Sequence, residues 1–218
     1  MAVSPADVVF LLDVDNTLLD NDAIVDDFRR RLIDASGPAG EHRYWEIFEE
    51  RWNLTGHADY LGALEQLRSE RPEAQGLDAS FLLEYPFASR LFPRALDVVA
   101  RLRLRGPVVI LSDGDDVFQP LKVERSGLGA AVTGVLIYVH KEQRLDDVAR
   151  LYPARRYVMV DDKVRILAAM KRVWRDRLTT VFVRQGHYAL DLKLVAASPP
   201  ADISIEAIGD LLALADTL

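Results

Sequence analysis

Acidic and hydroxyl side chains stand directly after three apolar runs of this sequence. Asp13 and Asp15 follow the first run. Ser112 ends a later run, and the pair Asp161 and Asp162 follows another. Carboxylates that share one crevice repel one another, and a divalent cation with hard oxygen ligands, above all Mg²⁺, keeps them ionised. One carboxylate can then attack the phosphorus of a phosphate ester, so these residue types predict magnesium-dependent chemistry on a phosphorylated substrate.

The elements that must position these side chains are buried strands and the helices between them. Continuous apolar runs predict strands at residues 8–12, 108–111, 132–139, 157–160 and 179–183, with a short one after 203. Amphipathic patterns predict helices at residues 93–105, 115–125, 142–151 and 164–174. This alternation predicts an α/β fold with a doubly wound, mostly parallel sheet. Ligands bind such sheets at the carboxyl ends of the strands, where the polar side chains stand.

One long segment interrupts this alternation, because it has helical periodicity and no strand-like run. Candidate helices lie at residues 22–35, 41–52, 58–69 and 79–85, with turns at 36–40 and 70–72. We therefore expect residues 1–19 and 91–218 to form the α/β core and residues 20–90 to form a helical cap. Trp45, Phe48 and Trp52 follow helical spacing, which favours the cap's own core over a substrate pocket.

Residues 13–17 read Asp-Val-Asp-Asn-Thr, which resembles the D-x-D-x-T signature of the haloacid dehalogenase (HAD) superfamily. Ser112 resembles the second motif of that family, Lys141 the third, and the acid pair at 161–162 the fourth. Residues 20–90 resemble the helical, C1-type cap that family members insert after the first motif. The resemblance covers nearly the whole chain and implies a Rossmann-like HAD core and a phosphatase.

The resemblance also implies roles for the residues of the first motif. Asp13 is the expected nucleophile, which forms an aspartyl-phosphate. Asp15 is the expected general acid and base, with a pKa that neighbouring carboxylates raise. Thr17 is expected to orient the Asp15 carboxylate by a hydrogen bond.

Further roles fall on the substrate and the metal. Ser112 is expected to bind a phosphoryl oxygen, helped by the backbone N–H of Asp113 or Gly114. The expected Mg²⁺ ligands are the Asp13 carboxylate, the Asp15 carbonyl oxygen and the Asp162 carboxylate. Asp161 is expected to stand behind these ligands or to share the site.

The chain has only five lysines, and two of them compete for the role of the family's catalytic cation. Lys141 precedes the acid pair by 20 residues and is favoured. Lys122 lies ten residues after Ser112 within a predicted helix, which is more typical of a solvated lysine. Two positions depart from the family pattern: Glu142 stands where many relatives have proline, and Ile166 stands where a common variant has another acid.

Other functions use similar residues. A phosphomutase or other phosphotransferase of the same superfamily needs the same side chains, and only its products would differ. Dehalogenation of a haloacid needs neither metal nor a second carboxylate, so Asp15 argues against it. A receiver-like signalling switch carries its acid pair on the first strand, whereas here the pair comes last.

Composition limits the partners. The 218 residues are 50% hydrophobic and 28% charged, contain no cysteine and carry a formal net charge of −7. These values exclude disulfides and thiol catalysis, and they disfavour nucleic acid. No apolar run approaches the roughly 18 residues that span a bilayer. We expect a cytoplasmic, Mg²⁺-dependent monomer or homodimer that acts on a small phosphorylated metabolite, with no nucleic-acid or membrane partner.

Overall fold

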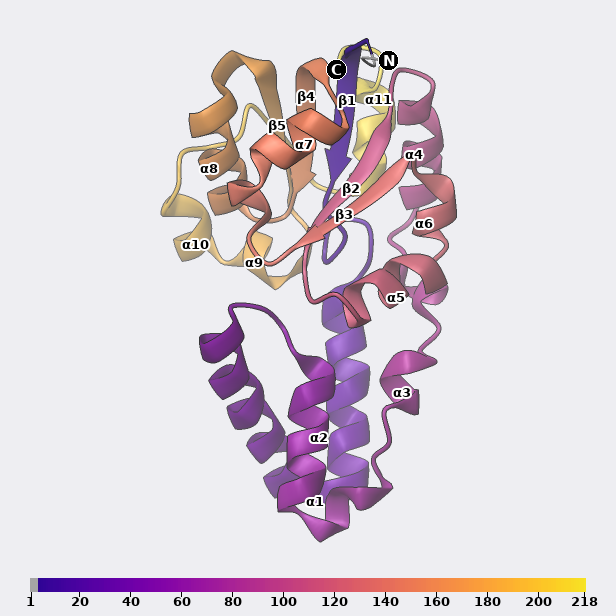
Figure 1. Ribbon diagram of the computed structural model, residues 1–218, viewed down its shortest axis with the longest axis vertical. Coiled ribbons are helices and arrows are strands. Elements are labelled where there is room, and N and C mark those ends of the chain that lie inside the picture. The colour runs from indigo at the N-terminus through magenta and orange to yellow at the C-terminus, as the bar shows by residue number, and fades with distance from the viewer. Residues whose placement is uncertain (1–3) are drawn as a thin grey trace.

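The computed structural model describes residues 4–218, in which six parallel strands form one sheet of order β3-β2-β1-β4-β5-β6 (Figure 1). The strands are β1 Ala6–Leu12, β2 Val108–Asp113, β3 Gly134–Tyr138, β4 Ala154–Asp161, β5 Leu178–Val183 and β6 Ile203–Ile205. Strands are added on one side of β1 up to β3 and on its other side from β4 onward. The predicted α/β fold with a doubly wound sheet is therefore confirmed, and the crevice lies where the order reverses, at the carboxyl ends of β1 and β4.

Strand β1 is buried on both faces because alternate residues face two separate cores. Val8, Phe10 and Leu12 pack in one core with three helices, which are α4 (Ala95–Arg103), α5 (Phe118–Arg125) and α11 (Leu211–Leu214). Val9 and Leu11 pack in the other core with α7 (Leu145–Leu151) and α8 (Val164–Trp174). The other core helices are α6 Leu128–Ala131, α9 Gly186–Leu190 and α10 Leu192–Ala196, with 3₁₀ turns η3 Lys141–Gln143, η4 Arg175–Arg177 and η5 Ile208–Asp210.

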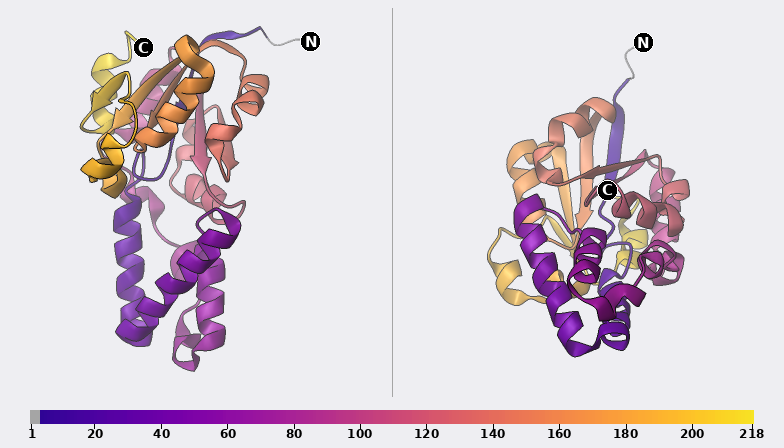
Figure 2. Two further views of the ribbon diagram at one scale, coloured as in Figure 1. Left: turned by 90° about the vertical axis from the view of Figure 1, so that its left-hand side faces the viewer. Right: turned by 60° about the horizontal axis from the view of Figure 1, so that its bottom comes forward.

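Between β1 and α4 the chain folds into helices that extend beyond the carboxyl end of the sheet (Figures 1 and 2). These are α1 Asn21–Thr55, α2 Tyr60–Glu70, η1 Pro72–Gly76, α3 Ser80–Leu83 and η2 Phe87–Arg90. The chain leaves and returns along neighbouring paths, since the Asp20 amide donates to the Arg90 carbonyl at 2.8 Å and the Phe92 amide donates to the Leu18 carbonyl at 2.9 Å. In residues 4–218 no helix combines the length and apolar character needed to cross a bilayer.

Helix α1 is kinked rather than interrupted by the five-residue turn that the sequence predicts. Only Gly37 leaves the helical conformation, with φ 70° and ψ 175°, and Pro38 starts the second arm. Glycine adopts this conformation without a Cβ clash, and proline is well accommodated at the start of a helix. The two arms fold back on each other as separate rods (Figure 2).

An aromatic cluster forms the core of the helical segment. The fully buried Tyr44 ring lies 5.0 Å from the rings of Phe28 and Trp45, and Phe48 packs beside them. The expectation that these side chains form a core holds for Trp45 and Phe48 and is wrong for Trp52, which is 43% exposed. Trp52 lies near the end of α1, where its ring is still 6.3 Å from that of Phe48.

Candidate active site

Asp13 is held at the end of β1 by contacts from three parts of the chain. Its amide donates to the Val160 carbonyl at 3.0 Å, so the residue continues the pairing with β4. The hydroxyl of Thr17 donates to Asp13 Oδ2 at 3.2 Å, and Ser112 Oγ lies 3.4 Å from Asp13 Oδ1. The residue is only 2% exposed.

Thr17 contacts a different carboxylate from the one expected. The prediction that it orients Asp15 is wrong, because the amides of residues 17–19 donate to the Val14 carbonyl and fold Thr17 back over the end of β1. There the Thr17 hydroxyl also accepts a hydrogen bond from the Asp162 amide at 3.1 Å. This hydroxyl thus ties the first strand-end acid to the last.

Lys141 is fully buried between two of the acids. Its Nζ lies 2.5 Å from Asp13 Oδ1 and 2.6 Å from Asp161 Oδ2. Burial lowers the pKa of Lys141, but the charges of Asp13 and Asp161 outweigh burial and raise that pKa above its usual value. The ammonium therefore stays charged and holds both carboxylates, and the choice of Lys141 over Lys122 as the catalytic cation stays a prediction.

Asp162 has carboxylate oxygens that nothing in the described chain satisfies. Both oxygens are buried and neither has a hydrogen-bond partner among residues 4–218. Burial raises the pKa of Asp162 well above its usual range. By contrast, Asp161 Oδ1 accepts the amide of Lys163 at 2.8 Å and its other oxygen meets Lys141. Asp162 is therefore the member of the acid pair whose oxygens accept no hydrogen bond from the described residues, although the charge of Lys163 partly offsets the effect of burial on its pKa.

The three acids form a cluster that suits a divalent cation. One oxygen each from Asp13, Asp161 and Asp162 lies within 4.8 Å of the other two. Hard carboxylate oxygens are the ligands that Mg²⁺ prefers, and an unsatisfied buried carboxylate is costly unless a cation pairs with it. The residues therefore fit the predicted metal, with Asp162 as the acid most in need of it.

Asp15 lies beside a lysine that the sequence places on a solvated helix face. Lys122 on α5 is only 1% exposed, so that expectation is wrong. Its Nζ lies 2.8 Å and 3.0 Å from the two oxygens of Asp15. The neighbour of Asp15 is thus an ammonium group, where the sequence led us to expect carboxylates.

Sequence reasoning missed Gln119, which joins the two sides of the site. Its Nε2 donates to Ser112 Oγ at 3.0 Å and lies 3.3 Å from Asp15 Oδ2. Gly114 leaves space for this side chain, since a Cβ there would lie 2.6 Å from Gln119 Cβ. The only available signal was the spacing of three residues between Gln119 and Lys122, which places both side chains on the same face of α5.

The second strand end contributes less to an anion site than expected. The amide of Gly114 donates to the Tyr138 carbonyl at 3.0 Å, so this N–H is committed to the sheet edge. The Asp113 side chain accepts the amide of Lys141 at 2.9 Å and thereby fixes the start of η3. Burial raises the pKa of Asp113. The Ser112 hydroxyl is buried beside Asp13, where it also accepts a hydrogen bond from Gln119, and its role as a phosphoryl ligand stays a prediction.

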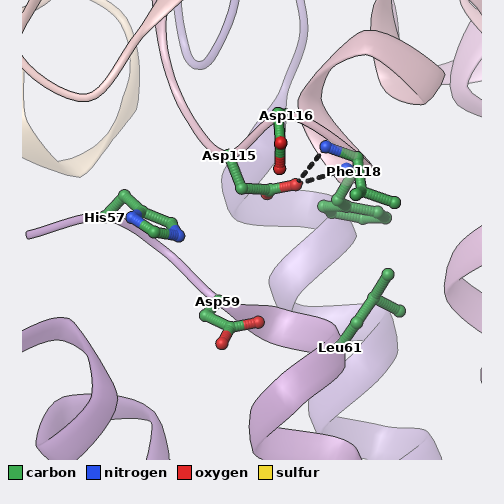
Figure 3. Close-up of a pocket in the computed structure, with 7 residues that line it drawn as sticks. His57, Asp59, Leu61, Asp115, Asp116 and Phe118 are labelled. Atoms are coloured by element: carbon green, nitrogen blue, oxygen red, sulfur yellow. Dashed lines mark hydrogen bonds between the residues drawn. The ribbon is translucent and has the colours of Figure 1, made fainter. Parts of the chain in front are cut away.

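A hollow of about 240 Å³ lies between the helical segment and the loop after β2. Figure 3 shows His57, Asp59 and Leu61 on one side and Asp115, Asp116 and Phe118 on the other. Asp115 accepts the backbone amides of Val117 and Phe118, but the N-cap position of α5 is Val117, so Asp115 lies two residues before the cap that the sequence predicts it to form. This hollow borders α5, the helix that carries Gln119 and Lys122.

Comparison with known proteins extends this picture. The model of a family described as haloacid dehalogenase-like hydrolase matches residues 8–173. A solved haloacid dehalogenase-like hydrolase from Burkholderia xenovorans LB400 is 57% identical, with 96% of this chain and 97% of that chain covered and a TM-score of 0.90. Among proteins with curated descriptions, none matches the chain.

More distant structures share the fold. The L-2-haloacid dehalogenase of Xanthobacter autotrophicus, solved with chloropropionic acid covalently bound, is 19% identical over 96% of this chain and 98% of that chain, with a TM-score of 0.63. A HAD-hydrolase from Bacillus subtilis, solved bound to magnesium, is 16% identical over 97% and 99% of the two chains, also with a TM-score of 0.63. The family match covers most of the chain and includes every strand-end acid of the site. The chain therefore belongs to the haloacid dehalogenase-like hydrolase family and is an enzyme.

Proposed function

We propose that this hydrolase is a Mg²⁺-dependent phosphatase that hydrolyses a small phosphomonoester. The observation that carries the proposal is the pair of unsatisfied, buried oxygens of Asp162 in the same acidic cluster as Asp13. A cation there would offset the negative charge of the cluster that the ammonium groups of Lys141 and Lys163 leave uncompensated. Asp15, two residues after the nucleophile, supplies the acid that an alkoxide leaving group needs.

Magnesium would be held by the carboxylates of Asp13 and Asp162 and the backbone carbonyl of Asp15, with Asp161 behind them or sharing the site. When bound, the ion neutralises the cluster and withdraws negative charge from the phosphoryl oxygens. Lys141 already holds Asp13 and Asp161 in place without it. The Ser112 hydroxyl would donate a hydrogen bond to a phosphoryl oxygen of the substrate and so stabilise the negative charge that builds up there in the transition state.

The reaction proceeds in two displacements at phosphorus, with Asp13 as the nucleophile of the first and the leaving group of the second. In the first, an oxygen of Asp13 bonds to phosphorus, the bond from phosphorus to the leaving oxygen breaks, and a proton passes from the Asp15 carboxyl to that oxygen. In the second, the oxygen of a water molecule bonds to phosphorus, the bond from phosphorus to the Asp13 oxygen breaks, and Asp15 takes the proton of the water. Inorganic phosphate leaves and the Asp13 carboxylate is restored. The helical segment over the crevice limits water access, which favours a small phosphorylated metabolite as substrate.

Dehalogenation is the alternative suggested by the names of distant relatives, which share the fold at 19–20% identity. Halide departs as a stable anion and needs neither proton nor metal, so that reaction would leave Asp15 and Asp162 without a task. Phosphotransfer to a second hydroxyl uses the same residues as hydrolysis. Hydrolysis, phosphotransfer and dehalogenation can be distinguished by the products that each reaction forms.

The test compares wild type with Asp13→Asn on 4-nitrophenyl phosphate and on a panel of phosphometabolites, with Mg²⁺ and with chelator. We expect phosphate release that needs Mg²⁺ and disappears in Asp13→Asn. Asp7→Asn is the matched control, because its side chain on β1 is 85% exposed. Retention of phosphate on an organic product would indicate a phosphomutase or phosphotransferase. Chloride release from 2-chloropropionate, with no phosphate release, would refute the proposal.

A further inference from the structure

The structure assigns Lys122 as a positioning residue that fixes the Asp15 carboxyl group for proton transfer, an inference that rests on the proposed phosphatase function. Each of the two reacting carboxylates is paired with its own buried lysine. Lys141 contacts Asp13, and Lys122 contacts Asp15. The first pair belongs to the family's motif pattern, whereas Lys122 lies outside all four motifs.

All three N–H donors of Lys122 have acceptors. Two are the oxygens of Asp15, at 2.8 Å and 3.0 Å, and the third is Asn21 Oδ1 at 2.9 Å. An ammonium has three donors, so this set satisfies it completely. Because its acceptors come from the loop after β1 and from the first turn of α1, the position of Nζ is defined by two parts of the chain besides α5 itself.

The surroundings of Lys122 exclude water and restrict its motion. The side chain is 1% exposed, and the Phe118 ring, one turn earlier on α5, lies 5.4 Å from Nζ. Phe118 in turn lies 5.5 Å from the Tyr60 ring at the start of α2. A long, flexible side chain is thus confined between the core helix and the helical segment, which makes it a rigid support for Asp15.

The partner acceptor, Asn21, is itself fixed. The backbone N–H of Asn21 donates to Asn16 Oδ1 at 3.0 Å, and the backbone N–H of Asp22 donates to the same oxygen at 3.1 Å. Asn16 adopts a left-handed conformation with φ 59°, between Asp15 and Thr17. The loop that carries Asp15 and the first turn of α1 are therefore joined both by Lys122 and by Asn16.

A purely stabilising role accounts poorly for this arrangement. Taking an ammonium out of water costs free energy that a pair with a partly exposed carboxylate, here 26% exposed, rarely recovers. An apolar residue would fill the same place beside Phe118 at lower cost. What the ammonium adds is a bidentate contact that fixes the orientation of a carboxyl group, and proton transfer depends on such orientation.

The predicted signature is a dependence on the leaving group. Phenyl phosphate and 4-nitrophenyl phosphate have similar shapes, but only the phenolate of the first needs strong help from an acid. We expect Lys122→Met to lower kcat for phenyl phosphate by about 10- to 100-fold and kcat for 4-nitrophenyl phosphate by no more than about 3-fold. Lys122→Arg, which keeps the charge, should recover part of the loss. Lys171→Met is the matched control, since Lys171 pairs with Asp202 at 2.7 Å on the far side of the sheet.

A double-variant cycle separates positioning from general damage. In the Asp15→Asn background, Lys122→Met should add no further leaving-group dependence, because the group that it positions has already lost its acid. Equal losses on both esters, or additive losses in the cycle, would overturn the inference and leave the proposed function standing. Absence of Mg²⁺-dependent phosphate release by wild type from either ester would overturn the proposed function and, with it, the role of Lys122.

Folding failure of Lys122→Met would not end the test. Asn21→Ala removes one acceptor of the ammonium from a partly exposed position and leaves the Asp15 contact in place. It should produce the same preference for 4-nitrophenyl phosphate at a smaller size, about 2- to 5-fold, because one of three anchors is lost. An unchanged ratio of the two rates in Asn21→Ala would contradict the inference.

Discussion

Replacing Asp162 by asparagine should stabilise the metal-free protein while it removes the response to Mg²⁺. The buried cluster holds three carboxylates, those of Asp13, Asp161 and Asp162, against the ammonium groups of Lys141 and Lys163. One negative charge is therefore left without a positive partner. Asp162→Asn removes that charge, and its amide N–H groups can donate to the neighbouring carboxylates.

The size of the effect follows from the two unsatisfied oxygens. A buried polar group without a partner costs about 1–3 kcal/mol. At about 2–4 °C per kcal/mol for a chain of this length, the metal-free variant should unfold roughly 2–12 °C above wild type near pH 8. Mg²⁺ at 100 times its Kd should raise the stability of wild type by about 2.7 kcal/mol, and the variant should lack this response.

The pH dependence of the stability difference between Asp162→Asn and wild type provides a second check. Burial raises the pKa of Asp162 in the folded protein above its unfolded value. Such a group contributes stability at low pH, and the contribution is lost as pH rises through the folded-state pKa. The advantage of Asp162→Asn without metal should thus be small at pH 5 and grow toward pH 8.

The assay is thermal unfolding with chelator and with Mg²⁺ at both pH values. Asp161→Asn is the informative contrast, because Asp161 is paired with Lys141 and its removal should bring no gain. Asp7→Asn controls for the loss of an exposed carboxylate. The reasoning is refuted if metal-free wild type is as stable as Asp162→Asn at pH 8, or if Mg²⁺ raises the Tm of both equally.

Two further substitutions test the site and the fold. Lys141→Met should leave Asp13 and Asp161 as unpaired buried charges. We therefore expect loss of phosphatase activity and a fall of about 3–5 kcal/mol in the free energy of unfolding, measured by urea titration. A variant as stable as wild type would contradict this account of the cluster. Gly37→Ala should cost about 1–3 kcal/mol, because the kink at φ 70° and ψ 175° is strained for any residue with a Cβ. Gly76→Ala is its control, since a Cβ meets nothing within 4 Å at either position and only Gly37 has a positive φ; equal Tm values for the two variants would show that the kink does not depend on glycine.

Much of the fold could be predicted because the signals are local. The pattern at residues 164–174 predicted α8 with the bounds that the structure has, and the apolar run before Asp13 predicted β1 as a strand buried on both faces. The kink at Gly37 was predicted as a five-residue turn, because glycine and proline mark a break without stating how many residues it takes. Helices α9 and α10 were not predicted, since five-residue helices carry too little periodicity.

The sequence by itself determined which strands end in acids and, because buried strands of a parallel sheet align their carboxyl ends, that those acids share one edge of the sheet. The strand order that makes β2, β1 and β4 neighbours came from the structure. Only the tertiary structure decided how the charges pair. Lys122 and Asp15 lie 107 residues apart, and Lys141 and Asp13 lie 128 apart, so no local pattern relates them. The packing of α5 against the first turn of α1 buries Lys122, and it is the packing around β4 that satisfies Asp161 while leaving Asp162 without a partner among the described residues. Pairing depends on distances across the folded chain, and those distances exist only once the helices are docked on the sheet.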